Sequence, residues 1–168
     1  YIDSLNLEKN NRIFLPLCGK SLDIHWLLAQ GYHLIGIDLS PIAIEELMAE
    51  LAIPFTERKL EKLTHYHHPQ IDLFVGDFFE LTSSHIGKID AIYDRAALVA
   101  LPEEMRTDYA QHLMQISNQA TQLLISFEYD QSVMAGPPFS ISPQQLKDYY
   151  SKQYQLQLLD SQTELLKG

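Results

Sequence analysis

Two apolar segments near the start of the chain end in residues that could hold a nucleoside. Residues 13–23 read Ile-Phe-Leu-Pro-Leu-Cys-Gly-Lys-Ser-Leu-Asp, an apolar run that breaks at Pro16 and Gly19. A second apolar run over residues 33–37 ends in Asp38. In nucleotide-binding α/β proteins a glycine turn offers backbone N–H groups at a helix N-terminus, and an acid about 20 residues later accepts hydrogen bonds from a ribose. The spacing predicts a nucleoside-containing cofactor. An ordinary βαβ unit with a solvated Asp38 is the alternative, because only one glycine of the G-x-G-x-x-G pattern is present.

Two further apolar runs also end in polar residues. Asp77 follows the run over residues 71–75, and Asp94 and Arg95 follow the run over residues 89–93. The carboxyl ends of parallel strands meet at one edge of a sheet, where ligands bind. We therefore expect these side chains to share one cleft with Gly19 and Asp38.

The elements that would position these residues alternate between strands and helices. Hydrophobic periodicity predicts strands over residues 12–17, 33–38, 71–75, 89–93, 121–127 and 155–159. Helices are predicted over residues 21–30, from Ser40-Pro41 to about residue 51, over residues 102–117, and from Ser142-Pro143 onward. Residues 55–63 are ambiguous, and we expect a helix or irregular segment leading into a hairpin. This order is typical of an α/β fold with a mainly parallel sheet and helices on both faces.

Composition favours a single domain over residues 1–168 that acts on a small molecule. The 168 residues carry a net charge of −10, from 22 acids and 12 bases, which would repel a phosphate backbone, so we expect no nucleic-acid partner. No apolar run approaches the ~20 residues of a membrane span, and we expect no membrane partner. The single cysteine cannot form an internal disulfide, which fits a reducing cytoplasm.

The cysteine and the histidines could act as a nucleophile or as metal ligands, but the residues around them in the sequence argue against both roles. Cys18 has no base paired with it locally, so we interpret it as a small buried hydrophobic residue. The run His65-Tyr66-His67-His68 has the look of a metal cluster, but it has no nearby cysteine or paired acids. We expect a solvated loop or a hairpin strand there, and no metal site. The other histidines are scattered: His25, His33, His85 and His112.

Five blocks of the sequence resemble the thiopurine S-methyltransferase family, in the same order and over nearly the whole chain. They are LCGKSLD from Leu17 with Trp26 after it, GIDLS from Gly36, GDFF from Gly76, YDRAALVALP from Tyr93 and GPPF from Gly136. The resemblance implies a Rossmann-like class I methyltransferase fold with S-adenosylmethionine as cofactor.

The resemblance also assigns residues to parts of the cofactor. It implies that Leu17 and Gly19 lie against the amino-acid half of S-adenosylmethionine and that Asp38 binds the ribose. It implies further that Asp77 and Phe78 bind the adenine.

For the chemistry, the resemblance places Arg95 near both the cofactor and a sulfur substrate. We take Arg95 and Asp94 as the catalytic candidates: Asp94 could hold Arg95 or polarise a thiol through water, and a structural salt bridge is the alternative. Methyl transfer is an in-line displacement that needs a well-placed acceptor rather than a protein nucleophile. A thiol is partly ionised near neutral pH, so modest help from the Arg95 charge suffices. The expected acceptor is a small aromatic or heterocyclic thiol, with selenium or tellurium compounds also open.

Two other functions share parts of this pattern. A nicotinamide-dependent oxidoreductase would use Asp38 in the same way, but would want a fuller glycine fingerprint and a second domain. A non-catalytic nucleoside-binding module would keep Asp38 and Asp77 but have no use for Arg95. The family's N-terminal lid segment and last strand are not found in residues 1–168, so we expect the chain to be part of a longer protein. We expect a monomer.

Overall fold

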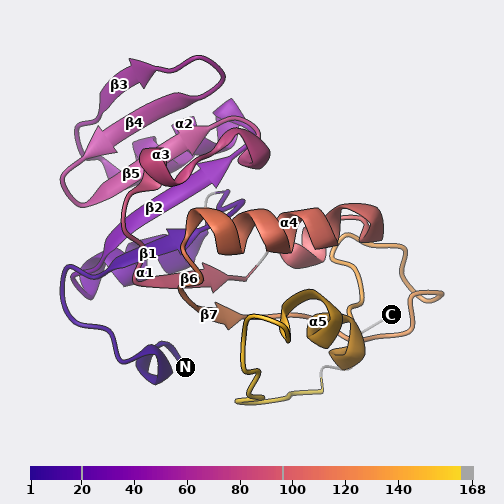
Figure 1. The fold of residues 1–168 in the computed structure, drawn as a ribbon. Coiled ribbons are helices and arrows are strands. Elements are labelled where there is room, and N and C mark those ends of the chain that lie inside the picture. The colour runs from indigo at the N-terminus through magenta and orange to yellow at the C-terminus, as the bar shows by residue number, and fades with distance from the viewer. Residues whose placement is uncertain (20, 96, 164–168) are drawn as a thin grey trace.

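The computed structural model describes residues 1–19, 21–95 and 97–163, and within them it forms a mixed seven-stranded sheet of order β3-β4-β5-β2-β1-β6-β7 (Figure 1). The strands β5, β2, β1, β6 and β7 are parallel to one another, whereas β3 and β4 are antiparallel to the strands beside them. The strands are β1 Arg12–Leu15, β2 His33–Asp38, β3 Thr56–Lys59, β4 Thr64–His68, β5 Ile71–Val75, β6 Ala91–Asp94 and β7 Thr121–Leu124. Lys20 and Ala96, which belong to the family-like blocks, lie outside the described residues.

Three of the helices begin at serine caps. The Ser21, Ser40 and Ser142 side chains each accept a hydrogen bond from a backbone N–H in the first turn of a helix. The helices are α1 Leu22–Ala29, α2 Pro41–Leu51, α3 Ser83–Ile86, α4 Glu103–Ile116 and α5 Pro143–Tyr150, with short 3-10 turns η1 Ile2–Leu5, η2 Phe78–Glu80 and η3 Leu98–Ala100. Across the described ranges, none of these helices is long and apolar enough to cross a membrane.

The sheet separates two hydrophobic cores, because side chains alternate between its faces along each strand. Ile13 and Leu34 pack with α1 and α2 on one face, whereas Phe14 and Ile35 pack with α3, α4 and α5 on the other. Figure 1 shows α4 lying across this second face. The predicted fold, a largely parallel sheet with helices on both faces, is confirmed.

Two predicted elements are wrong. Residues 56–59 form strand β3, which pairs with β4 in a hairpin, rather than a helix or irregular segment. This hairpin closes the sheet edge farthest from β7 (Figure 1). Residues 155–159 form no strand, and Leu156, Leu158 and Leu159 are exposed, because alternation alone makes no strand where no neighbour supplies hydrogen bonds.

Candidate active site

The turn after β1 brings backbone N–H groups to the Asp38 carboxylate. Leu17 and Gly19 both have left-handed backbone conformations, with φ of 48° and 51°, which fold the chain sharply before α1. The Gly19 N–H donates to Asp38 Oδ2 at 2.8 Å, and the Ser40 N–H donates to Oδ1 at 2.9 Å. Asp38, the last residue of β2, therefore joins the two loops that leave β1 and β2 at the carboxyl edge of the sheet.

Cys18 and Gly36 make this approach possible from inside the turn. The Cys18 N–H donates to the Ile37 carbonyl at 2.9 Å, which brings the turn against β2. A Cβ on Gly36 would lie 2.8 Å from Cys18 Sγ and 3.1 Å from Leu73 Cδ2, so any side chain there would force Cys18 to shift. Burial, helped by the charge of Asp38, raises the pKa of the Cys18 thiol to about 12. The interpretation of Cys18 as a small buried hydrophobic residue is confirmed.

The segment after β5 presents Asp77 and Phe79, whereas Phe78 points into the core. Asp77 is exposed, and its Oδ1 accepts from the Phe79 N–H at 2.9 Å. The Phe78 ring is buried against Phe14 and Tyr109. The expected contact of the Phe78 ring with adenine therefore does not fit its position, because the ring fills the space between the sheet and α4. Phe79 is the exposed aromatic side chain at this point.

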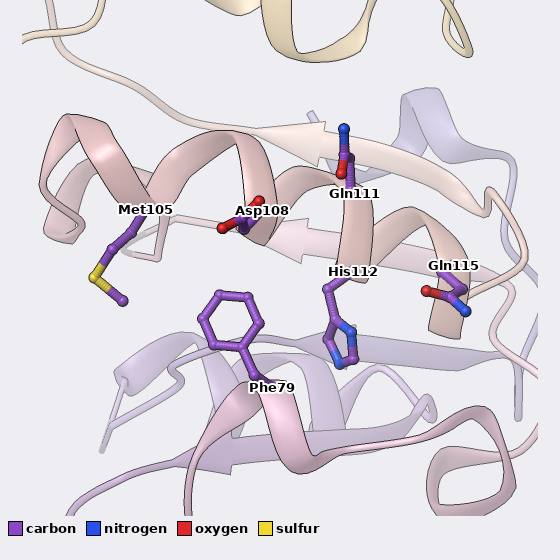
Figure 2. A pocket seen from close by; sticks show the side chains of 6 residues that line it. All are labelled: Phe79, Met105, Asp108, Gln111, His112 and Gln115. Carbon is purple, nitrogen blue, oxygen red and sulfur yellow. The ribbon is translucent and has the colours of Figure 1, made fainter.

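A shallow groove of about 430 Å³ runs between Phe79 and the outer face of α4. Figure 2 shows Phe79 beside His112, with Met105 and Asp108 farther along the helix. The His112 Nε2 bonds to the Leu81 carbonyl at 2.8 Å, which ties α4 to the segment after η2. The groove therefore borders the loop that carries Asp77.

Asp94 is completely buried. Its Oδ2 accepts from the Tyr109 hydroxyl at 2.7 Å, and its Oδ1 accepts from the backbone N–H groups of Ala97 and Leu98 at 3.0 and 3.3 Å. Burial raises the pKa of Asp94 to about 6, and these three hydrogen bonds partly oppose the rise. Asp94 thus fixes the backbone at Ala97 and Leu98, shortly after Arg95.

Arg95 pairs with Asp23 rather than with Asp94. Its NH1 group donates to Asp23 Oδ2 at 2.5 Å, and the Tyr93 hydroxyl donates to the same oxygen at 2.9 Å. The hydrogen bond to Asp23 and the charge of that carboxylate raise the pKa of Arg95, which stays a cation. Sequence reasoning missed Asp23, although it lies in the first turn of α1 within the LCGKSLD block.

A second groove, of about 580 Å³, lies between the N-terminal end of α4 and the loop over residues 128–142. The Phe139 N–H donates to the Val99 carbonyl at 2.7 Å, and the buried Arg106 guanidinium lies 5.6 Å from the centre of the Phe139 ring. Phe139 lines the groove together with Arg106 and Tyr129. The GPPF block is thus anchored beside η3, close in sequence to Arg95.

The site therefore has two polar clusters, one on each side of the β1 turn. Because β1 lies between β2 and β6, Asp38 and Arg95 flank that turn from opposite sides. Asp38 and Gly19 offer a carboxylate acceptor and a backbone that can approach closely, which suits ribose hydroxyls and the adjoining part of a nucleoside. Arg95 offers a fixed cation beside them.

Comparisons with known proteins point to the same family as the five sequence blocks. A model of the family "Thiopurine S-methyltransferase (TPMT)" matches residues 1–167. The thiopurine S-methyltransferase of Acinetobacter baylyi is 51% identical over 166 residues, which cover 96% of this chain and 76% of that protein. A solved S-adenosylmethionine-dependent methyltransferase from Anabaena variabilis has a TM-score of 0.64 at 18% identity, covering 88% of this chain and 65% of that one. The small RNA methyltransferase HEN1 has a TM-score of 0.63 at 14% identity, covering 90% and 20%. At these identities the two structures show a shared fold.

Proposed function

Because the chain belongs to the thiopurine S-methyltransferase family, whose methyl donor is S-adenosylmethionine, we propose that it methylates the sulfur of a small aromatic or heterocyclic thiol. Selenium or tellurium compounds are a second class of acceptor, since their anions are also soft nucleophiles. The observation that carries the proposal is the pair of clusters flanking the β1 turn: Asp38 with Gly19 at 2.8 Å, and Arg95 with Asp23 at 2.5 Å.

The residues around Asp38 fit the cofactor. We propose that the Asp38 carboxylate binds the ribose hydroxyls, that Leu17 and Gly19 lie along the amino-acid half, and that Asp77 accepts from the adenine amino group. Phe78 contributes its backbone, and the exposed ring beside the adenine is that of Phe79. When bound, S-adenosylmethionine supplies a methyl carbon activated by the positive sulfonium.

Arg95 acts on the acceptor in this proposal. A thiol loses part of its proton near neutral pH, and a fixed guanidinium nearby favours the thiolate. Asp23 and Tyr93 restrict the guanidinium to one orientation, so less side-chain entropy is lost when the acceptor binds. Asp94 has no route to the acceptor from its buried position and is a positioning residue, which holds the backbone after Arg95.

Calorimetry on one sample with S-adenosylmethionine, its demethylated product and NAD tests the cofactor. We expect binding of the first two and none of NAD; the reverse would support an oxidoreductase and overturn the proposal. Methyl transfer is then measured with an aromatic thiol and with the matching phenol as control. Transfer to the thiol alone is expected, whereas cofactor binding without transfer to any sulfur, selenium or tellurium acceptor would indicate a non-catalytic nucleoside-binding module.

A further inference from the structure

A cluster of three histidines and one aspartate lies on the sheet near β4. His65 and His67, two residues apart on β4, point to the same face of the sheet, and Asp72 on β5 is the direct partner of His67 in the antiparallel ladder. His65 Nε2 lies 2.7 Å and His67 Nδ1 lies 2.6 Å from Asp72 Oδ1. His33, the first residue of β2, places its Nε2 2.8 Å from Asp72 Oδ2.

From this arrangement we infer that His65, His67 and Asp72 form a binding site for a late first-row divalent metal ion such as Zn²⁺. Two imidazole nitrogens and one carboxylate oxygen are the donors that such ions prefer. The three donor atoms lie within 4.8 Å of one another, so small side-chain rotations bring them around one ion. Water would complete a four-coordinate site. This inference departs from the expectation of no metal site, because the structure places an acid beside the histidines: the β4–β5 turn folds Asp72 back against His67.

The position of Asp72 is unusual for an acid, and this argues for a specific role. It lies within a strand whose neighbouring residues Ile71, Leu73 and Phe74 are completely buried, and aspartate is disfavoured in such a strand. Imidazole nitrogens of His33, His65 and His67 lie within 2.8 Å of its two carboxylate oxygens, so nitrogen donors from two other strands gather around this one acid.

The surroundings of the cluster allow an ion to enter and hold the ligands in place. The His67 side chain is 52% exposed and that of His65 is 22% exposed, so the site opens to solvent on the β4 side. The His65 ring stacks on Phe74 with centroids 4.4 Å apart, which restricts its rotation. His33 holds the second carboxylate oxygen, as outer-shell partners of metal ligands do. Arg58, opposite His65 in the β3–β4 ladder, is exposed, so water screens its charge.

The metal site lies apart from the proposed cofactor site. His33 begins β2 and Asp38 ends it, so the two sites are about 16 Å apart at ~3.3 Å per residue. The ion would connect β4 to β5 and so stabilise the hairpin edge of the sheet (Figure 1). Its role would be structural or regulatory rather than a part of methyl transfer.

Calorimetric titration tests this inference: Zn²⁺ is added to the tag-free chain at neutral pH. The absorption spectrum of bound Co²⁺ then reports whether the coordination is tetrahedral. We expect one ion per chain with a micromolar or tighter Kd and a higher melting temperature with Zn²⁺. His67→Ala, at an exposed residue that can be removed without unfolding, should abolish both effects. His33→Ala should weaken binding by roughly 10- to 100-fold.

His68→Ala is the matched control, because His68 lies on the same strand but its ring packs toward Phe55 on the other face. It should bind Zn²⁺ as the wild-type chain does. The inference is overturned if the wild-type chain shows no saturable binding, if His67→Ala binds equally well, or if His68→Ala loses binding to the same extent. None of these outcomes depends on methyl transfer, so the test is independent of the proposed function.

Discussion

At the scale of single residues, the Asp38 carboxylate has two tasks that can be separated. It holds the Gly19 and Ser40 N–H groups, and it is the proposed ribose acceptor. We expect Asp38→Ala to weaken S-adenosylmethionine binding by roughly 2–3 kcal/mol, the scale of lost hydrogen bonds to a charged group. Calorimetry measures the affinity, and thermal melting confirms that the variant is folded.

Asp90→Ala is the matched control for this change. Asp90 Oδ2 also accepts from a backbone N–H, that of Arg12 at 2.8 Å, but at the opposite edge of the sheet. This variant should lose stability and keep its cofactor affinity. Equal affinity in the folded Asp38→Ala variant would show that Asp38 only ties the two loops together.

Arg95 and Asp23 should affect turnover more than cofactor binding. We expect Arg95→Ala to lower kcat/KM for an aromatic thiol by roughly 100- to 1,000-fold, the scale of a lost charge-stabilising donor. Arg95→Lys should rescue only part, because one ammonium cannot reproduce a planar fork. Asp23→Asn should shift the pH profile of turnover to lower pH, because the Arg95 charge is then not offset by a carboxylate and favours the thiolate more strongly. Tyr93→Phe removes only a neutral donor and should have a smaller effect. Wild-type kinetics in both Arg95 variants would make this residue structural.

The raised pKa of Asp94 predicts how its contribution to stability changes with pH. The unfolded carboxyl titrates near 3.8 and the folded one near 6, so between these values the folded state holds a proton that the unfolded state releases. The free energy of unfolding should therefore fall as pH rises from about 4 to 6, by on the order of 3 kcal/mol. Urea unfolding from pH 4 to 7 measures this, with Asp94→Asn as a variant that cannot titrate. Parallel pH curves for the two proteins would contradict the prediction.

Sequence reasoning predicted where in the fold its candidate site residues lie, because the positions that follow apolar runs are fixed by local pattern. Asp38, Asp77 and Arg95 all lie at the carboxyl edge of the sheet, as their places after apolar runs indicate. It did not find Asp23 or Asp72, whose roles depend on residues from distant strands. The direction of the Phe78 ring was also missed, because adjacent aromatic residues in a short 3-10 turn give no periodicity to tell core from surface.

At the scale of elements, the fit of the β1 turn against β2 depends on the absence of a side chain at Gly36. A Cβ there would lie 2.8 Å from Cys18 Sγ, so we expect Gly36→Ala to destabilise the protein by about 1–3 kcal/mol, the usual cost of overpacking. In a Cys18→Ala background the closest obstacle is gone, and the same change should cost less. Urea unfolding of the two single variants and the double variant gives the coupling energy, and simple additivity would mean that the two side chains do not oppose each other.

Elements that depend on local interactions were predicted correctly, whereas elements that depend on a distant partner strand were not. Helices α1, α2 and α5 were predicted because a serine cap and an apolar face are both local. Strand β3 was missed because all four of its residues are exposed, so only its pairing with β4 makes it a strand. Residues 155–159 show the opposite case: their side chains alternate as in a strand, but within the described residues they pair with no neighbouring strand.

At the scale of the whole molecule, the charge of the chain, rather than its fold, narrows the class of substrate. The same fold occurs in a small RNA methyltransferase, with a TM-score of 0.63, so the shape of the sheet and helices does not by itself exclude a nucleic-acid substrate. This chain, however, has a net charge of −10 and a pI near 5.0. Affinity for a phosphate backbone depends on lysine and arginine contacts that release counterions, and the average field here opposes such contacts.

We therefore expect no measurable binding of double-stranded RNA or DNA, with a Kd weaker than about 10⁻⁴ M even at ~50 mM salt, where electrostatic attraction is strongest. Fluorescence anisotropy with a labelled duplex measures this, and methyl transfer to an aromatic thiol by the same sample shows that the protein is active. Micromolar binding that weakens steeply with added salt would reveal a basic surface that the net charge conceals. The proposed substrate would then change from a small thiol to a nucleic acid. The roles proposed for Asp38 and Gly19 would stay the same, because the cofactor is the same in both cases.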